Sequence, residues 1–303
     1  MKTKIFHLQN LTALHVGTGQ GVGVVDLPIA RSKATNLPIV PGSGLKGVLR
    51  SFLTPEGNTA KEGEMDKKDI QTLFGPDNQL EEAHAGAIAF GDAQLLLLPI
   101  RSFAGTVAYA TCGYILRQYK RDMATELNVP NITDNTARIT QDSKLMITAN
   151  TVALEDLDIE SHQTQLTDDW ATLITNNLYP DSVMNATQWR DEIAKRFIIL
   201  PDDIFSFLAD TATEIRTRIR IDQETRVVQA GALWTEENLP AETVLWGVIG
   251  ITQSRDKNQK RTAQELADLL PHQEMRLQIG GKHTVGRGFC RLLISDLLVQ
   301  GGK

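Results

Sequence analysis

The fold is decided by residues 15–50, which read HVGTGQGVGVVDLPIARSKATNLPIVPGSGLKGVLR. A loop with four glycines leads to a lone acid, Asp26. A short strand is predicted over residues 37–40 and ends at a proline. The triplet Gly42-Ser43-Gly44 then opens a helix, because apolar residues recur at helical spacing over residues 45–53. The stretch therefore predicts loop, strand and helix in close succession.

The start of this helix is a candidate phosphate site. Its unpaired backbone N–H groups and partial positive charge favour an anion. Ser43 is predicted to cap the helix, and Gly42 and Gly44 allow close approach of a ligand. Lys46 and Arg50 lie four residues apart on one face and add two full charges. The alternative is an ordinary strand-turn-helix with a solvated lysine and arginine.

The composition is that of an ordinary globular protein with two cysteines, and the sequence predicts no membrane segment. The chain has 303 residues, 41% hydrophobic and 22% charged, which is enough for a large core. Cys112 and Cys290 provide neither a disulfide framework nor a zinc-ligand pairing, and they fit a reducing cytoplasm. The longest apolar run is too short to span a bilayer, and the N-terminus lacks a signal-peptide core. We therefore expect a cytoplasmic protein.

Charge and glycine motifs narrow the class of ligand. A net charge of −6 argues weakly against nucleic acid, but local basic loops can still bind a phosphate chain. The first glycine-rich loop lacks the strand-GxGxxG-helix context of a dinucleotide site. The chain also contains no GxxxxGK[ST] motif, so both nucleotide-site interpretations are rejected. A metabolic enzyme that binds a phosphorylated small molecule remains a possible alternative, and it predicts that no RNA is retained on purification.

Strands and helices follow one another in the irregular order typical of an α+β fold. Residues 54–84 are polar and are predicted to be a surface excursion, and residues 128–165 are polar and irregular. Asp202 is predicted to cap the helix that follows it, and Thr262 with Glu265 forms a capping box. The remaining predictions are strands at 4–16, 87–90, 95–100, 106–110, 244–251, 276–279 and 289–294, and helices at 116–127, 170–178, 189–197, 203–209 and 262–271.

Residues 216–233 predict a projecting hairpin. Arg216, Arg218 and Arg220 alternate with apolar residues, which places three guanidinium groups on one face of an extended chain. A polar turn follows, and residues 226–233 return and continue into Trp234-Thr235-Glu236-Glu237. The alternative is an exposed hairpin whose arginines are merely solvated.

A second glycine-rich basic loop, GGKHTVGRG, spans residues 280–288. Four glycines in nine residues allow left-handed backbone angles that direct successive N–H groups at one anion. Its candidate ligands are Gly280, Gly281, Lys282, Thr284 and Arg287. The alternative is a tight connection that needs glycine for geometry alone.

Several segments together resemble the RAMP superfamily of CRISPR proteins. They are PGSGLKGVLR, LFG, GAIAFGDAQLLLLPIRSFAGTVAYATC, GALWTEENLP and LQIGGKHTVGRGFCRL. The chain is most similar to the repeated backbone subunit of the type III-B (Cmr) RNA-targeting effector, from about residue 5 to residue 294. An early GSxLKGxLR motif and a late GGxxTxGRG loop are specific in combination.

This resemblance implies a fold, an assembly and a set of partners. It implies a single domain over residues 1–303, an α+β fold with an RRM-like (ferredoxin-like) core. The core would carry a surface insertion at 54–84, an irregular or helical insertion at 128–214, and a thumb-like hairpin at 215–240. Copies would stack head to tail along a CRISPR guide RNA with other Cmr subunits. Their thumbs would interrupt the duplex with target single-stranded RNA, and no membrane would be involved.

The resemblance also assigns roles to residues. An aspartate in the glycine-rich loop cleaves target RNA in the type III-B backbone, and Asp26 occupies that position here. His15 and the Glu236-Glu237 pair match family positions near the cleavage site. The late loop, residues 280–288, matches the family loop that packs against the guide. The implied activity is an endoribonuclease within the assembled complex.

The chemistry of RNA narrows what Asp26 would do. RNA supplies its own nucleophile, the 2′-hydroxyl, which must be in line with the leaving 5′-oxygen. One carboxylate could hold a divalent metal such as Mg²⁺ loosely on the phosphate, or act as a weak base. The alternative for Asp26 is a residue that caps a turn, and the alternative for His15 is a structural role. The chain as a whole could instead be a guide-binding scaffold subunit without catalysis, or the type III-A counterpart.

Overall fold

The computed structural model describes residues 1–19, 25–55, 65–76, 84–132 and 135–297. The strands are β1 (Lys2–Asn10), β2 (Ile39–Val40), β3 (Ile88–Phe90), β4 (Ala93–Ser102), β5 (Thr106–Cys112), β6 (Ala137–Ile139), β7 (Thr151–Leu154), β8 (Leu157–Gln163), β9 (Phe197–Leu200), β10 (Glu214–Ile221), β11 (Val228–Asn238), β12 (Val244–Ile251), β13 (Met275–Gln278) and β14 (Phe289–Asp296). The helices are α1 (Gly42–Leu53), α2 (Lys67–Phe74), α3 (Gly113–Met123), α4 (Gln165–Leu178), α5 (Ala186–Ala194), α6 (Asp202–Thr211) and α7 (Ala263–Asp268), with a 3₁₀ turn at His283–Val285.

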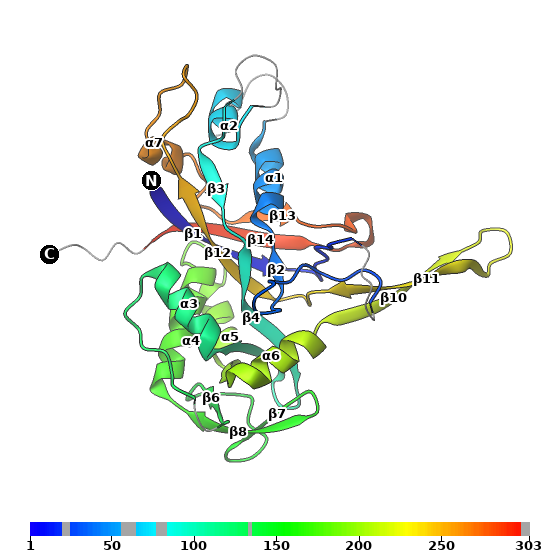
Figure 1. Ribbon diagram of the computed structural model, residues 1–303. Coiled ribbons are helices and arrows are strands. Elements are labelled where there is room, and N and C mark those ends of the chain that lie inside the picture. Colours follow the sequence, from blue (N-terminus) through cyan, green and yellow to red (C-terminus); the bar gives the residue numbers. More distant parts are fainter. Residues whose placement is uncertain (20–24, 56–64, 77–83, 133–134, 298–303) are drawn as a thin grey trace.

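These elements form a mixed α+β fold, as predicted, around one large sheet (Figure 1). The strand order is β13-β14-β1-β12-β4-β5-β9-β6-β8-β7, with β2 beside β4 and β3 beside β12. β1 is antiparallel to β12 on one side and to β14 on the other, so that Leu8 faces Leu245 and Leu292. The first and last strands of the chain are thus neighbours, which brings the two glycine-rich loops to the same end of the sheet.

Strand β1 separates two buried clusters because successive side chains of a strand point to opposite faces. Phe6 and Leu8 pack in a cluster with α1, α2 and α7, whereas Ile5 packs in a cluster with α3, α4 and α6. The predicted first strand, 4–16, was too long. Residues 11–16 leave the sheet, and Leu14 makes only an isolated bridge to Leu239.

Helix α1 forms where the sequence predicts it, but its start differs in detail. Leu45 and Leu49 are buried, whereas Phe52 is 50% exposed although it continues the apolar stripe. The predicted cap at Ser43 is wrong: the helix starts after Pro41, and Asp92 Oδ1 accepts from the Gly42 amide at 2.9 Å. The donor at the helix start is therefore satisfied by a side chain from a distant strand turn.

The regions predicted as insertions contain more regular structure than expected. Residues 54–84 include α2, whose Ile70 and Leu73 are buried in the core, so this region is not only a surface excursion. Residues 128–165, predicted as irregular, contain β6, β7 and β8. Strand β8 alternates exposed with buried side chains over residues 158–162, since one of its faces is covered and the other is exposed.

The structure also corrects one helix cap and confirms another. The Asp202 side chain makes no capping bond to its own helix. Instead, Asp202 Oδ1 accepts from the Tyr114 amide at 2.8 Å, at the start of α3. The capping box of Thr262 with Glu265 at the start of α7 is present as predicted.

Strands β10 and β11 form the predicted hairpin, a two-stranded sheet that extends away from the body of the molecule (Figure 1). Arg218 lies opposite Trp234, and Ile219 lies opposite Leu233. Ile219 and Leu233 are 47% and 65% exposed, so the described residues leave the apolar face of the outer hairpin uncovered.

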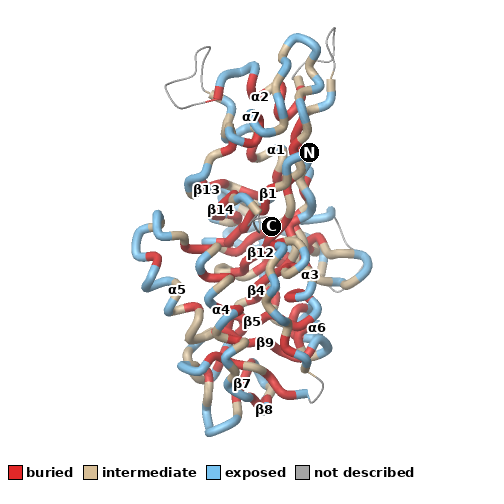
Figure 2. Tube along the Cα trace, turned by 90° about the vertical axis from the view of Figure 1, so that its left-hand side faces the viewer, coloured by how far each residue is buried: buried red, intermediate tan, exposed pale blue. Residues whose placement is uncertain are grey.

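The buried residues lie mainly in the strands of the large sheet rather than in the loops. Figure 2 shows buried segments along the central strands and exposed segments along the outer sides of the surrounding helices. Among the described residues, no helix combines the length and apolar character needed to cross a membrane.

His7 in β1 is a buried titratable group with a measurable consequence. Its Nε2 lies 2.7 Å from the Tyr119 hydroxyl, and burial lowers its pKa from 6.5 to about 4. As the pH falls below 6.5, unfolded chains bind a proton that the folded chain excludes until about pH 4. Stability is therefore lost across that window.

We predict that the free energy of unfolding falls by about 2 kcal/mol more between pH 7 and pH 5 in the wild type than in His7→Gln, because glutamine does not titrate. Urea unfolding of both chains at the two pH values measures this difference. An equal loss of stability in the two chains would show that His7 is not responsible.

Candidate functional site

The two glycine-rich loops meet at the segment that precedes the first of them. The Gly281 amide donates to the His15 carbonyl at 3.0 Å, and the Gly288 amide donates to the Ala13 carbonyl at 2.9 Å. Gly280 has φ +76°, and a Cβ there would lie 2.3 Å from the His15 carbonyl oxygen. Only glycine permits this approach without displacement of the backbone. The clusters predicted from opposite ends of the chain thus lie together; residues 20–24 of the first loop lie outside the described residues.

His15 is buried where the second loop meets this segment, with 6% of its surface exposed. Its Nδ1 lies 2.7 Å from the Glu237 carbonyl oxygen, which can only accept, so Nδ1 carries the proton. A Cβ at Gly17 would lie 2.7 Å from Nε2, so the ring packs against the first loop. His15 thus connects that loop with the base of the hairpin. Its predicted catalytic role stays a prediction.

Asp26 belongs to a segment that pairs with strand β11. Leu27 bridges Glu236 in parallel; the Leu27 amide donates to Thr235 O at 3.1 Å, and the Glu237 amide donates to Leu27 O at 3.0 Å. The segment is therefore an added strand at the base of the hairpin, and Asp26 stands exposed at its start.

Thr235 holds the Asp26 carboxylate. Oδ2 of Asp26 accepts from the Thr235 amide at 2.7 Å and from the Thr235 hydroxyl at 2.9 Å. The same hydroxyl accepts from the Asp26 amide at 3.1 Å. The backbone and then the side-chain hydrogen bond from Thr235 hold the pKa of Asp26 below its ordinary value. Asp26 is therefore a carboxylate at neutral pH and a poor acceptor of protons.

The described residues do not form a closed metal cage. No group of three or more His, Cys, Asp or Glu side chains among them could hold a metal ion. Asp26 can offer one ionised carboxylate, which suits an oxygen-binding divalent cation, but the described residues do not complete a ligand set around it, which leaves room for RNA phosphate or water. The residues thus fit a loosely held ion better than a resident one.

Glu236 is occupied by cations and an indole rather than facing solvent. It is 2% exposed, and its Oε1 accepts from Trp234 Nε1 at 2.7 Å and from Lys282 Nζ at 2.9 Å. Arg218 Nε lies 3.8 Å away. Burial raises the pKa of Glu236, but the hydrogen bonds from Lys282 and Trp234 outweigh it and leave the pKa below its ordinary value. Glu236 therefore ties the hairpin to the second loop, and its predicted catalytic role stays a prediction.

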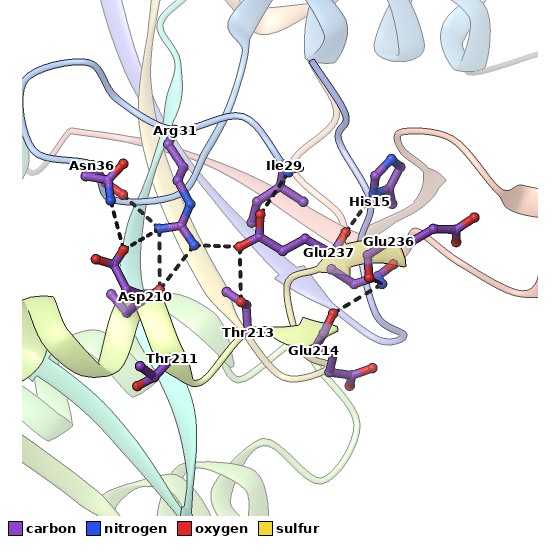
Figure 3. A network of polar contacts seen from close by, with 12 residues as sticks. His15, Ile29, Arg31, Asn36, Asp210, Thr211, Thr213, Glu214, Glu236 and Glu237 are labelled. Atoms are coloured by element: carbon purple, nitrogen blue, oxygen red, sulfur yellow. Dashed lines mark hydrogen bonds and ion pairs between the residues drawn. The ribbon is translucent and has the colours of Figure 1, made fainter. Parts of the chain in front are cut away.

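Glu237 joins the hairpin base to the segment that follows Asp26 (Figure 3). Its Oε2 accepts from the Ile29 amide at 3.1 Å, and its Oε1 accepts from Arg31 at 2.6 Å and from the Thr213 hydroxyl at 3.0 Å. Arg31 also donates to Asp210 Oδ1 at 2.9 Å, which connects the network to α6. This network, buried at Glu237 and exposed at Asp210, fixes the direction in which the Asp26 segment leaves the body.

Thr235 and Arg31 were not predicted as site residues. A partial signal existed, because alternation along β11 places Thr235 and Glu237 on one face and Trp234 and Glu236 on the other. Which segment covers the first face depends on tertiary pairing, which the local pattern does not contain. Arg31 lies only five residues after Asp26, but its partners are about 180 and 206 residues away in the chain.

The early basic pair is engaged within the protein. Lys46 Nζ donates to Ile88 O at 2.9 Å, and Arg50 donates to Gly75 O at 2.8 Å. Burial, and then the nearby Arg50 and Arg255, lower the pKa of Lys46. Both side chains thus fasten α1 to neighbouring backbone, which is a structural role that the sequence did not predict.

The remaining predicted RNA contacts differ in accessibility. Gly42 is packed against β3–β4 backbone, whereas Ser43 and Gly44 are exposed at the first turn of α1. Thr284 is exposed in the second loop, and Arg287 is half-buried with no ion pair recorded within the described part of the chain. Lys282 retains 31% side-chain exposure beside Glu236. The second loop therefore presents the more available cations.

The chain is similar in sequence and in fold to several known proteins. The sequence model of the RAMP superfamily matches residues 7–291. The chain is 33% identical over 314 aligned positions to the CRISPR system Cmr endoribonuclease Cmr4 of Pyrococcus furiosus, which covers 100% of this chain and 99% of that protein. It is 30% identical over 312 positions to the CRISPR system CMR subunit Cmr4 of Saccharolobus solfataricus, covering 95% of each. The crystal structure of oligomeric Cmr4 from Pyrococcus furiosus superposes with a TM-score of 0.70 at 27% identity over 98% of both chains.

Proposed function

The chain belongs to the RAMP superfamily, and from that membership and the geometry at Asp26 we propose that it is the repeated backbone subunit of a type III-B CRISPR effector. It binds guide RNA along the phosphate chain and cleaves complementary target RNA at regular intervals. Two relatives that match nearly its full length bear Cmr names, which supports type III-B over type III-A. One of them is named an endoribonuclease, which supports catalysis over a scaffold role.

The single observation that carries the catalytic proposal is the placement of Asp26. It is an exposed carboxylate fixed at the base of a projecting hairpin, in the segment that follows the first glycine-rich loop. In this proposal the sheet with its α1 helix is the RRM-like core, and β10–β11 is the thumb that interrupts the guide–target duplex. The exposed apolar face of that thumb and the oligomeric relative support contact between successive copies in a head-to-tail stack.

The reaction needs little from the protein beyond geometry. The 2′-oxygen attacks the adjacent phosphorus and the P–O5′ bond breaks, which leaves a 2′,3′-cyclic phosphate and a 5′-hydroxyl. One proton leaves the 2′-hydroxyl, and one reaches the 5′-oxygen. The thumb would splay the target so that these atoms are in line, and Asp26 would act as a weak base toward the 2′-hydroxyl or hold a divalent ion at the scissile phosphate. A divalent ion, when bound by Asp26 and RNA phosphate, would neutralise charge on that phosphate.

We predict that Asp26→Asn and Asp26→Ala in the assembled complex lose about 100-fold or more of target cleavage while target binding is retained, because both remove the carboxylate that would hold a divalent ion or accept a proton. Cleavage of labelled target RNA and a binding titration measure the two effects. Asp158→Asn, an exposed aspartate in β8, is the matched control.

Cleavage at the wild-type rate by both Asp26 variants would remove the catalytic assignment and favour the scaffold subunit. Loss of target binding together with cleavage would make Asp26 a structural residue.

Guide binding gives an independent prediction. Arg287→Ala lowers affinity by a similar factor for guides of unrelated sequence, because a phosphate contact carries no sequence information. The slope of log affinity against log salt falls by about 0.7 for each lost contact to single-stranded RNA. Arg276→Ala is the control. The Arg276 side chain lies in β13, is 79% exposed and forms an ion pair with Glu274. A loss confined to one guide sequence, or an equal loss in Arg276→Ala, contradicts the contact.

A further inference from the structure

We infer that Thr235 is a positioning residue for RNA cleavage: its hydroxyl orients the Asp26 carboxylate and couples the orientation of that carboxylate to the hairpin. The inference rests on the proposed function, since it concerns how Asp26 is presented to target RNA.

Thr235 and Asp26 each donate hydrogen bonds to the other, which fixes the orientation of the Asp26 carboxylate. The Thr235 hydroxyl donates to Asp26 Oδ2 and accepts from the Asp26 amide, so both its proton and a lone pair are used. The Thr235 amide donates to the same Oδ2. Three hydrogen bonds between two residues leave the carboxylate little rotational freedom. No partner of Oδ1 is recorded within the described residues, and Asp26 is exposed, so that oxygen is available to a ligand.

The residue that orients the Asp26 carboxylate belongs to the hairpin rather than to the body of the molecule. Thr235 lies in β11 and pairs across the ribbon with Thr217 in β10. Any movement of the hairpin base therefore carries Thr235, the paired Leu27 and the Asp26 carboxylate together. A thumb that separates guide from target would in this way set the separation and the position of the acid in one step.

The orientation of the Asp26 carboxylate affects the rate of cleavage, because small misplacement of a reacting group costs about 100-fold. A threonine that only folded the loop would not change the ratio of cleavage to binding.

Two substitutions at Thr235 separate these roles. Thr235→Val keeps the shape and removes the hydroxyl, whereas Thr235→Ser keeps the hydroxyl. Thr217→Val makes the same change across the ribbon, away from Asp26, and sets the baseline. Each variant is assembled into the full complex, and single-turnover cleavage and target binding are measured beside Asp26→Asn.

We expect Thr235→Val to cleave about 10- to 100-fold more slowly than the Thr217→Val baseline with target binding unchanged. Thr235→Ser should stay within about 3-fold of the wild type, since its hydroxyl makes the same hydrogen bonds.

Cleavage by Thr235→Val at the baseline rate, or an equal loss in Thr235→Ser, would overturn the inference while Asp26→Asn remained inactive. Full cleavage by Asp26→Asn would instead show that the proposed function itself is wrong.

Discussion

The pairing of Leu27 with strand β11 is the constraint on which the site depends. It joins segments about 209 residues apart in the chain and makes the Asp26 segment part of the hairpin base. Without it, a glycine-rich loop and an exposed acid would have no defined place relative to the ribbon. Two backbone hydrogen bonds are a modest stabilisation, so the buried contacts of the neighbouring carboxylates must hold the register.

Those carboxylates belong to adjacent residues, and their arrangement follows from the strand. Glu236 and Glu237 point to opposite faces of β11, where one binds Lys282 and the other binds Arg31. Each is nearly buried, and a buried carboxylate requires a cation and hydrogen bonds to remain charged. The hairpin base therefore holds the second glycine-rich loop on one side and the Asp26 segment on the other. Two loops from opposite ends of the chain are positioned by one dipeptide.

Features with a local cause could be predicted from the sequence, and features with a distant cause could not. The α1 helix, the alternating hairpin, the capping box at Thr262 and the two glycine-rich loops all carry their signal within a few residues. The cap of α1 comes from Asp92, and the Asp26 contact comes from Thr235, so neither is visible locally. Strands β6 and β7 were missed because they are only three and four residues long, and β8 was missed because its exposed side chains are polar, as in a loop. Asp26, His15 and Glu236 came from family resemblance rather than from any pattern in the residues themselves.

Amide hydrogen exchange in the folded chain tests most directly whether the Asp26 segment pairs with strand β11. The Leu27 amide donates to Thr235 O and the Glu237 amide donates to Leu27 O, so both should be protected as strongly as the amides that pair β11 with β10. Exchange of Leu27 at the rate of an open loop, beside a protected hairpin, would show that Asp26 is not held by the ribbon and would contradict the account.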